Sequence, residues 1–202
     1  MNNLYFEYGD REVEYLCGRD KKLGAAIEKV GKIQRGINPN LFAALIESIV
    51  GQQISAKAAV TVCSKLEALC NMDASVLNVL TLEQVQACGM SFRKAGYIKS
   101  TAKAVFDGAL DIGALPSKSD SEIIQILTKL DGVGVWTAEM MLIFSLNRLN
   151  VISYGDLAIR RGIMRLYGHK DLPKTRFDRY AKRYAPYASV ASLYLWQIAS
   201  QI

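Results

Sequence analysis

A glycine-containing turn and an aspartate one helix later are the residues of this chain whose types and spacing could do chemistry. Residues 130–138 read Leu-Asp-Gly-Val-Gly-Val-Trp-Thr-Ala, and Asp156 follows in the sequence Ser-Tyr-Gly-Asp. A Gly-x-Gly turn between two helices presents main-chain N–H groups at a helix start, where a phosphate binds readily. A carboxylate at a helix start is favoured in its ionised form. The two features together predict a phosphate grip and an ionised acid in one neighbourhood.

Helices surround both features, because apolar residues recur at helical spacing through nearly every segment. Proline is rare, with four in 202 residues, and no alternating run is long enough to form a sheet. The sequence therefore predicts an all-α fold. Asn40 is expected to cap one helix, and Ser55 and Thr81 are expected to begin two others. We expect helices over residues 23–32, 41–50, 54–69, 91–106, 121–129, 134–148, 156–167 and 176–202, and two short ones within 75–88.

The positive charge of the chain is concentrated in one stretch. The net charge is +6, and residues 156–184 alone carry nine Lys or Arg against three Asp. Taken alone, such a stretch is as often a solvated helical face as a binding surface. Beside a phosphate-binding turn, it favours a polyanionic partner.

Cysteine and histidine content argues against a zinc site. The four cysteines, Cys17, Cys63, Cys70 and Cys88, have no short paired spacing, and His169 is the single histidine. We expect reduced thiols in a cytoplasmic protein. No apolar run has the length of a membrane span, so we expect no membrane association.

Four stretches carry a resemblance to a known family: residues 130–166, 51–59, 93–98 and 155–161. With these motifs the chain resembles the helix-hairpin-helix (HhH-GPD) DNA glycosylase superfamily, and within it the bacterial 3-methyladenine DNA glycosylase II branch. The resemblance runs from about Asn38 to about Trp196. Larger bacterial relatives carry an additional N-terminal β domain, and too few residues precede Asn38 for us to expect it here.

The resemblance implies a fold of two helical lobes with a DNA-binding cleft. One lobe would span residues 39–150 and contain the helix-hairpin-helix motif at about 121–148. The second lobe would combine residues 1–38 with 151–202 and carry Asp156.

The resemblance also implies an activity, hydrolysis of the N-glycosidic bond of alkylated purines in duplex DNA after base flipping. It places the family's catalytic aspartate on Asp156, which would stabilise the positive charge that develops on the sugar. Trp136 stands where lyase-coupled members carry a lysine, so we expect a monofunctional enzyme. Its indole face would attract a cationic alkylated base.

Further site residues follow from the same resemblance. Met140 and Tyr187 would line the base pocket with Trp136. Gln53 occupies the position of the wedge that fills the gap left by the flipped base. Gln52, beside it, is expected to hold the loop rather than to touch DNA.

The hairpin would grip one phosphate through main-chain groups of Gly132, Gly134, Trp136 and Thr137. No cofactor is required, and family members hold a structural sodium or potassium ion at this hairpin. The matching carbonyl donors are those of Thr128, Leu130 and Val133. Asp131 departs from the family, which has proline there, and an acid beside the phosphate lowers DNA affinity unless its carboxylate points away or faces the cation.

Two other readings stay open from the residues alone. Helix-hairpin-helix proteins often bind DNA without chemistry, and a glycosylase of this type can act on deaminated or mismatched bases. The expected partner in every case is double-stranded DNA, damaged in the enzymatic readings. The resemblance implies a monomer in the bacterial cytoplasm, at the nucleoid.

Overall fold

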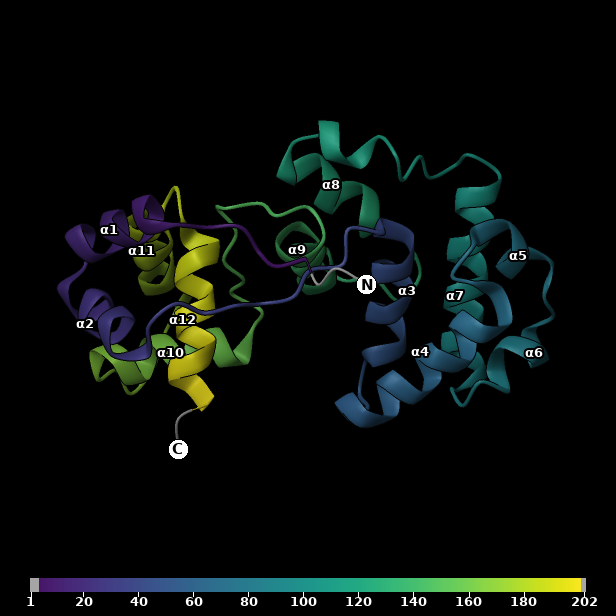
Figure 1. The fold of residues 1–202 in the computed structure, drawn as a ribbon, viewed down its shortest axis with the longest axis horizontal. Helices are drawn as coiled ribbons and strands as arrows, with labels where there is room; N and C mark the ends of the chain where they lie inside the picture. Colours follow the sequence, from purple (N-terminus) through teal and green to yellow (C-terminus); the bar gives the residue numbers. More distant parts are fainter. Residues whose placement is uncertain (1–3, 201–202) are drawn as a thin grey trace. The chain divides into compact units, whose positions relative to one another are not determined.

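The computed structural model describes residues 4–200, and over this range every element is a helix apart from one isolated pairing of extended segments. The expected all-α class is confirmed (Figure 1). The chain forms two compact units, one of residues 38–141 and one of residues 1–37 with 142–202. The division falls after Met141, within α9, whereas the sequence analysis placed it at residue 150. Among the described residues, no helix has both the length and the apolar character needed to cross a membrane.

The unit of residues 38–141 holds the elements from α3 to the first part of α9. Within it, α3 packs on α4 and α7, and α7 also packs on α5 and α6. Its elements are α3 (Leu41–Gly51), α4 (Ala56–Cys70), α5 (Ala74–Val79), α6 (Leu82–Gln86), α7 (Phe92–Phe106), the short 3-10 helix Leu115–Ser117, α8 (Asp120–Leu127) and α9 (Val135–Phe144).

Side-chain caps fix where three of these helices begin. The side chains of Asn40, Ser55 and Thr81 each accept a hydrogen bond from a main-chain N–H of the first helical turn, as the sequence predicts. The α3 helix is apolar on nearly every side and supplies the centre of the core, where Leu45, Ile46 and Ile49 are fully buried. The loop that follows α3 therefore leaves from a rigid, buried helix.

The second unit holds α1 (Asp10–Arg19), α2 (Lys21–Val30), α10 (Leu157–Tyr167), α11 (Lys174–Tyr184) and α12 (Ala188–Ser200). Two expectations are corrected here. The expected single helix at residues 23–32 is α2 preceded by a further helix, α1, because Asp20 ends one and caps the other. The expected helix at 176–202 is two helices, because Pro186 lacks the N–H that a continuous helix would need.

The close packing of α10 on α12 organises this unit. A Cβ added to Gly162 of α10 would lie 2.3 Å from the carbonyl oxygen of Leu195 in α12, so only glycine allows the two backbones to approach this closely. Ser189 and Leu195 of α12 are buried, and α12 also packs on α1, α2 and α11. The pairing of α10 with α12 fixes the helix that begins at Asp156.

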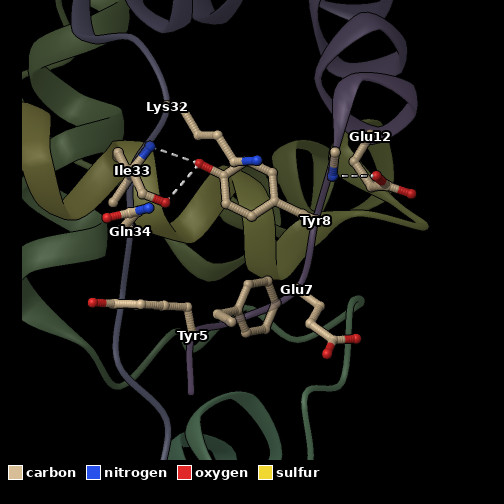
Figure 2. A pocket seen from close by; sticks show the side chains of 9 residues that line it. Tyr5, Glu7, Tyr8, Glu12, Lys32, Ile33 and Gln34 are labelled. Atoms are coloured by element: carbon tan, nitrogen blue, oxygen red, sulfur yellow. Dashed lines mark hydrogen bonds between the residues drawn. The ribbon is translucent and has the colours of Figure 1, made fainter. Parts of the chain in front are cut away.

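An N-terminal extended segment completes the unit. The Phe6 N–H donates to the Arg35 carbonyl (2.8 Å), and the Ile37 N–H donates to the Leu4 carbonyl (3.0 Å). Figure 2 shows the Tyr8 hydroxyl, which reaches from the first of these extended segments to the second, donating to the Ile33 carbonyl (2.9 Å) and accepting from the Ile33 N–H (2.8 Å). These contacts surround an open hollow of about 470 Å³.

A buried carboxylate joins α2 to α10 and α11. Asp20 is 5% exposed, accepts from the main-chain N–H groups of Lys22 and Leu23, and also accepts from the Tyr167 hydroxyl (2.6 Å) and the Arg183 guanidinium (2.7 Å). Burial opposes the charge on Asp20, but these hydrogen bonds outweigh it and lower the pKa of the carboxyl below its usual range. Asp20 is thus an ionised structural anchor.

Candidate active site and phosphate-contact residues

Asp156 is the N-cap of α10. One of its carboxylate oxygens accepts from the main-chain N–H groups of Ala158 (2.8 Å) and Ile159 (2.9 Å). The other oxygen accepts from the indole Nε1–H of Trp196 (3.2 Å). The residue is 8% exposed, so a charge there needs such partners. The cap uses one oxygen, and the second is oriented by a side chain from a different helix.

Trp196 is a further residue of the candidate site, and no sequence motif points to it. It lies in α12, is half-buried and packs on Phe144, with ring centroids 5.5 Å apart. No motif links positions 156 and 196, because the contact depends on the close approach of α10 and α12 at Gly162. The sequence shows a glycine at position 162, but it does not show that this glycine faces another helix.

The chain leading into Asp156 is held by α12 as well. The Ser189 hydroxyl accepts from the Val151 N–H (2.8 Å) and donates to the Arg148 carbonyl (2.6 Å). The Ser189 N–H donates to the Leu149 carbonyl (3.0 Å). The start of α12 therefore fixes the loop before the acid, and its later turns supply the indole that contacts it.

Tyr187 lies in the same unit as Asp156, and its ring is 9% exposed. It packs edge-to-face on Tyr15, with ring centroids 5.2 Å apart, and the Tyr15 hydroxyl donates to the Ala185 carbonyl (2.8 Å). These contacts hold the ring in place. The predicted role of Tyr187 as a pocket wall stays a prediction.

The predicted hairpin is α8, a turn of residues 128–134, and α9, which ends at Phe144 rather than at the expected residue 148. Gly132 has φ +78°, and a Cβ there would lie 2.3 Å from the Tyr97 ring, so the turn requires glycine. The Gly134 carbonyl accepts the first helical bond of α9, from Ala138 (3.1 Å), and a Cβ on Gly134 would meet no atom within 4 Å. The two glycines thus serve different purposes, one in packing and one on an open surface.

The side chains at the start of α9 divide by exposure. Trp136 is 46% exposed, and Met140, one turn later, is half-buried. The Thr137 side chain is buried, so any DNA contact of this residue would be made by its main chain. Asp131 is exposed at the turn. Trp136 and Met140 lie in the unit of residues 38–141, and Asp156 and Tyr187 lie in the other unit.

The proposed donors for a monovalent cation lie at the end of α8 and in the turn. Thr128 is the C-cap of α8, where helix carbonyls lack partners further along the helix. The Leu130 carbonyl accepts from the Val133 N–H (3.1 Å) and keeps a second lone pair. Main-chain oxygens at a helix end fit an alkali cation in donor type. The ion stays a proposal.

Gln53 lies at the tip of the loop of residues 52–55 between α3 and α4, which we call the wedge loop. It is exposed and has φ +57°, an uncommon backbone conformation for a residue with a side chain. The side-chain amide of Gln52 points elsewhere and donates to the Gly132 carbonyl of the hairpin turn (2.8 Å). Gln52 therefore holds the loop, as the sequence analysis expects.

Comparison with known proteins places the chain in a family. The family model of the HhH-GPD superfamily of base excision DNA repair proteins matches residues 46–186. The chain belongs to this superfamily.

Individual relatives agree. DNA-3-methyladenine glycosylase 1 of Schizosaccharomyces pombe is 32% identical over 91% of this chain and 84% of its own length. The crystal structure of a DNA-3-methyladenine glycosidase from Bacillus halodurans is 37% identical and has a TM-score of 0.87, covering 98% of this chain and 93% of its own. The structure of S. pombe 3-methyladenine DNA glycosylase in complex with abasic DNA is 30% identical, with a TM-score of 0.80 and coverage of 93% and 95%.

Proposed function

We propose that this protein is a monofunctional DNA glycosylase that removes alkylated purines of the 3-methyladenine and 7-methylguanine type from duplex DNA. The observation that carries the proposal is Asp156, a carboxylate held by three N–H groups at the position that the family resemblance aligns with the catalytic aspartate. The names of the relatives support the substrate class.

The reaction breaks the bond between C1′ of deoxyribose and the purine nitrogen. The electron pair of that bond leaves with the base, which turns a cationic methylated purine into a neutral leaving group. Positive charge develops on the sugar, and the Asp156 carboxylate stabilises it. The oxygen of a water molecule then bonds to C1′, and Asp156 accepts the proton. The products are a free base and an intact abasic site.

Trp136 is the reason that we expect no lyase activity. An indole cannot form a Schiff base with the opened sugar, so no lyase step follows hydrolysis. Its exposed face is suited to stack on a flipped cationic purine, an attraction of up to about 2 kcal/mol when water is excluded. Met140, one turn further along α9, and Tyr187 would complete the pocket.

DNA contacts come from the hairpin and the wedge loop. The start of α9 would bind one phosphate through main-chain N–H groups, and the open surface at Gly134 leaves room for the DNA backbone. A sodium or potassium ion held by the carbonyls of Thr128, Leu130 and Val133 would add positive charge at that phosphate. Gln53 would fill the gap in the duplex. We expect the protein to act as a monomer on chromosomal DNA, in the bacterial cytoplasm.

The test is release of bases from methylated duplex DNA, with strand breaks scored before and after alkali. We expect methylpurines in the supernatant and breaks only after alkali, which cleaves abasic sites. Breaks without alkali would contradict the role given to Trp136. The protein could instead bind DNA and release bases only from hypoxanthine-containing or mismatched duplexes. That result would identify a glycosylase for deaminated or mismatched bases rather than for alkylated purines. Binding without release from any duplex would identify a non-catalytic DNA-binding protein.

A further inference from the structure

A lysine of α7 binds the end of α3 and the first residue of the wedge loop. The Lys94 ammonium donates to the carbonyls of Val50 (2.7 Å) and Gln52, at the C-terminal end of α3. The last carbonyls of a helix lack partners within it, so the ammonium caps α3 and at the same time fixes the first residue of the loop. Burial lowers the pKa of Lys94. This lysine is committed to main-chain carbonyls rather than to solvent or phosphate.

The same loop is hydrogen-bonded to the hairpin turn. The Gln52 amide donates to the Gly132 carbonyl (2.8 Å), and the Tyr97 ring lies directly against Gly132. Tyr97 and Lys94 lie one turn apart on α7. One helix thus supports the wedge loop through Lys94 and the hairpin turn through Tyr97, and Gln52 joins the loop to the turn.

The conformation of Gln53 needs this support. A residue with a side chain at φ +57° stores backbone strain, which persists only where the surroundings determine the conformation. The Gln53 side chain is exposed, and the loop beside it is fixed by Gln52 and Lys94. The contacts of its neighbours therefore support the conformation of Gln53.

We propose that Lys94 and Gln52 are positioning residues that hold the Gln53 wedge at a fixed register from the phosphate-gripping turn. This inference rests on the proposed function, because it assigns the wedge and the grip to one lesion-reading element. The consequence is discrimination between damaged and undamaged DNA. A wedge held in position favours binding to duplex DNA in which a base is already missing from the stack. Loss of Lys94 or Gln52 lets the loop move. The preference for abasic over undamaged duplex then falls, while the hairpin still binds phosphate.

The chain contains a matched control for Lys94. Lys99 lies on the same helix and caps α5 in the same way, donating to the carbonyls of Leu77 (3.1 Å), Asn78 (2.6 Å) and Leu80 (2.5 Å). Burial lowers its pKa too. Lys94→Met and Lys99→Met therefore remove the same kind of helix cap, but only the first frees the wedge loop.

The experiment measures the dissociation constants of two duplexes at one salt concentration, one containing a tetrahydrofuran abasic analogue and one undamaged. We expect Lys94→Met and Gln52→Met to lower the preference for the analogue by about tenfold. Lys94→Arg should retain most of the preference for the abasic duplex, and Lys99→Met should keep the wild-type preference. Thermal unfolding should shift similarly for Lys94→Met and Lys99→Met.

An equal preference in Lys94→Met and Lys99→Met would overturn the proposal. If Lys94→Met does not fold, Gln52→Met decides the question in the same assay, and a wild-type preference in that variant would overturn the proposal. The binding readout needs no catalysis, so it separates the two hypotheses. Loss of preference in a protein that releases no base would leave this inference intact and reject the proposed function. Base release with unchanged preference in Gln52→Met and Lys94→Met would do the reverse.

Discussion

At the scale of the residue, the account depends on how Asp156 is held. Capping N–H groups bind one oxygen, and the Trp196 indole binds the other from α12. The motif predicts Asp156 at the start of a helix, and the structure has it there as the N-cap of α10. The indole contact joins residues far apart in the chain, and nothing in the spacing of residues 156 and 196 reveals it.

Trp196→Phe tests that contact. Phenylalanine keeps a ring beside Phe144 but removes the N–H that orients the second carboxylate oxygen. We expect the single-turnover rate of base release to fall by about tenfold, because a misoriented carboxylate stabilises the sugar cation less well. The DNA concentration for half-saturation should change little. A rate equal to that of the wild type would show that the indole does not position Asp156.

At the scale of the element, helix starts were the most predictable feature. Asn40, Ser55 and Thr81 cap the helices they were expected to begin, because a capping side chain and its N–H partners are neighbours in sequence. The break between α1 and α2 differs from the single helix that the sequence predicts. Asp20 caps α2 locally, but Tyr167 and Arg183, distant in sequence, complete its environment.

The two hairpin glycines give a prediction at this scale. Gly134→Ala should leave thermal stability nearly unchanged and weaken binding of undamaged duplex, by about tenfold, because its Cβ enters the surface proposed for the phosphate. Gly132→Ala should instead destabilise the fold by about 1–3 kcal/mol, because of its positive φ and its overlap with Tyr97. Thermal unfolding and fluorescence anisotropy of labelled DNA measure the two effects. A stability loss in Gly134→Ala as large as in Gly132→Ala would contradict this division.

At the scale of the whole molecule, charge counted along the sequence overstates the surface available to DNA. Four of the nine basic residues in the stretch 156–184 bind within the protein. Arg165 donates to the Ala199 carbonyl, Arg183 binds Asp20, Lys174 pairs with Asp178, and Arg176 pairs with Asp171. The sequence shows the basic stretch and the nearby aspartates of the two local pairs, but the contacts of Arg165 with the Ala199 carbonyl and of Arg183 with Asp20 join residues far apart in the chain and depend on tertiary structure.

The Asp20 anchor gives a pH-dependent prediction for stability. The pKa of Asp20 is lowered in the folded protein, so its contribution is complete above its unfolded pKa and is lost as pH falls through the folded value. We expect Asp20→Asn to reduce the free energy of unfolding by about 1–3 kcal/mol at pH 7. The difference from wild type should shrink below about pH 4. Denaturant titrations at several pH values measure it, and a difference that is constant with pH would show that the charge of Asp20 is not what stabilises.

The central claim is that the Asp156 carboxylate drives base hydrolysis, and Asp156→Asn tests it most directly. Asparagine keeps the size and a capping oxygen but removes the charge. Single-turnover release of 7-methylguanine from methylated duplex should fall by about 100-fold or more, because charge stabilisation of the sugar is lost. Affinity for a tetrahydrofuran duplex should stay within about threefold of wild type. Release at the wild-type rate by a folded Asp156→Asn protein would contradict the account.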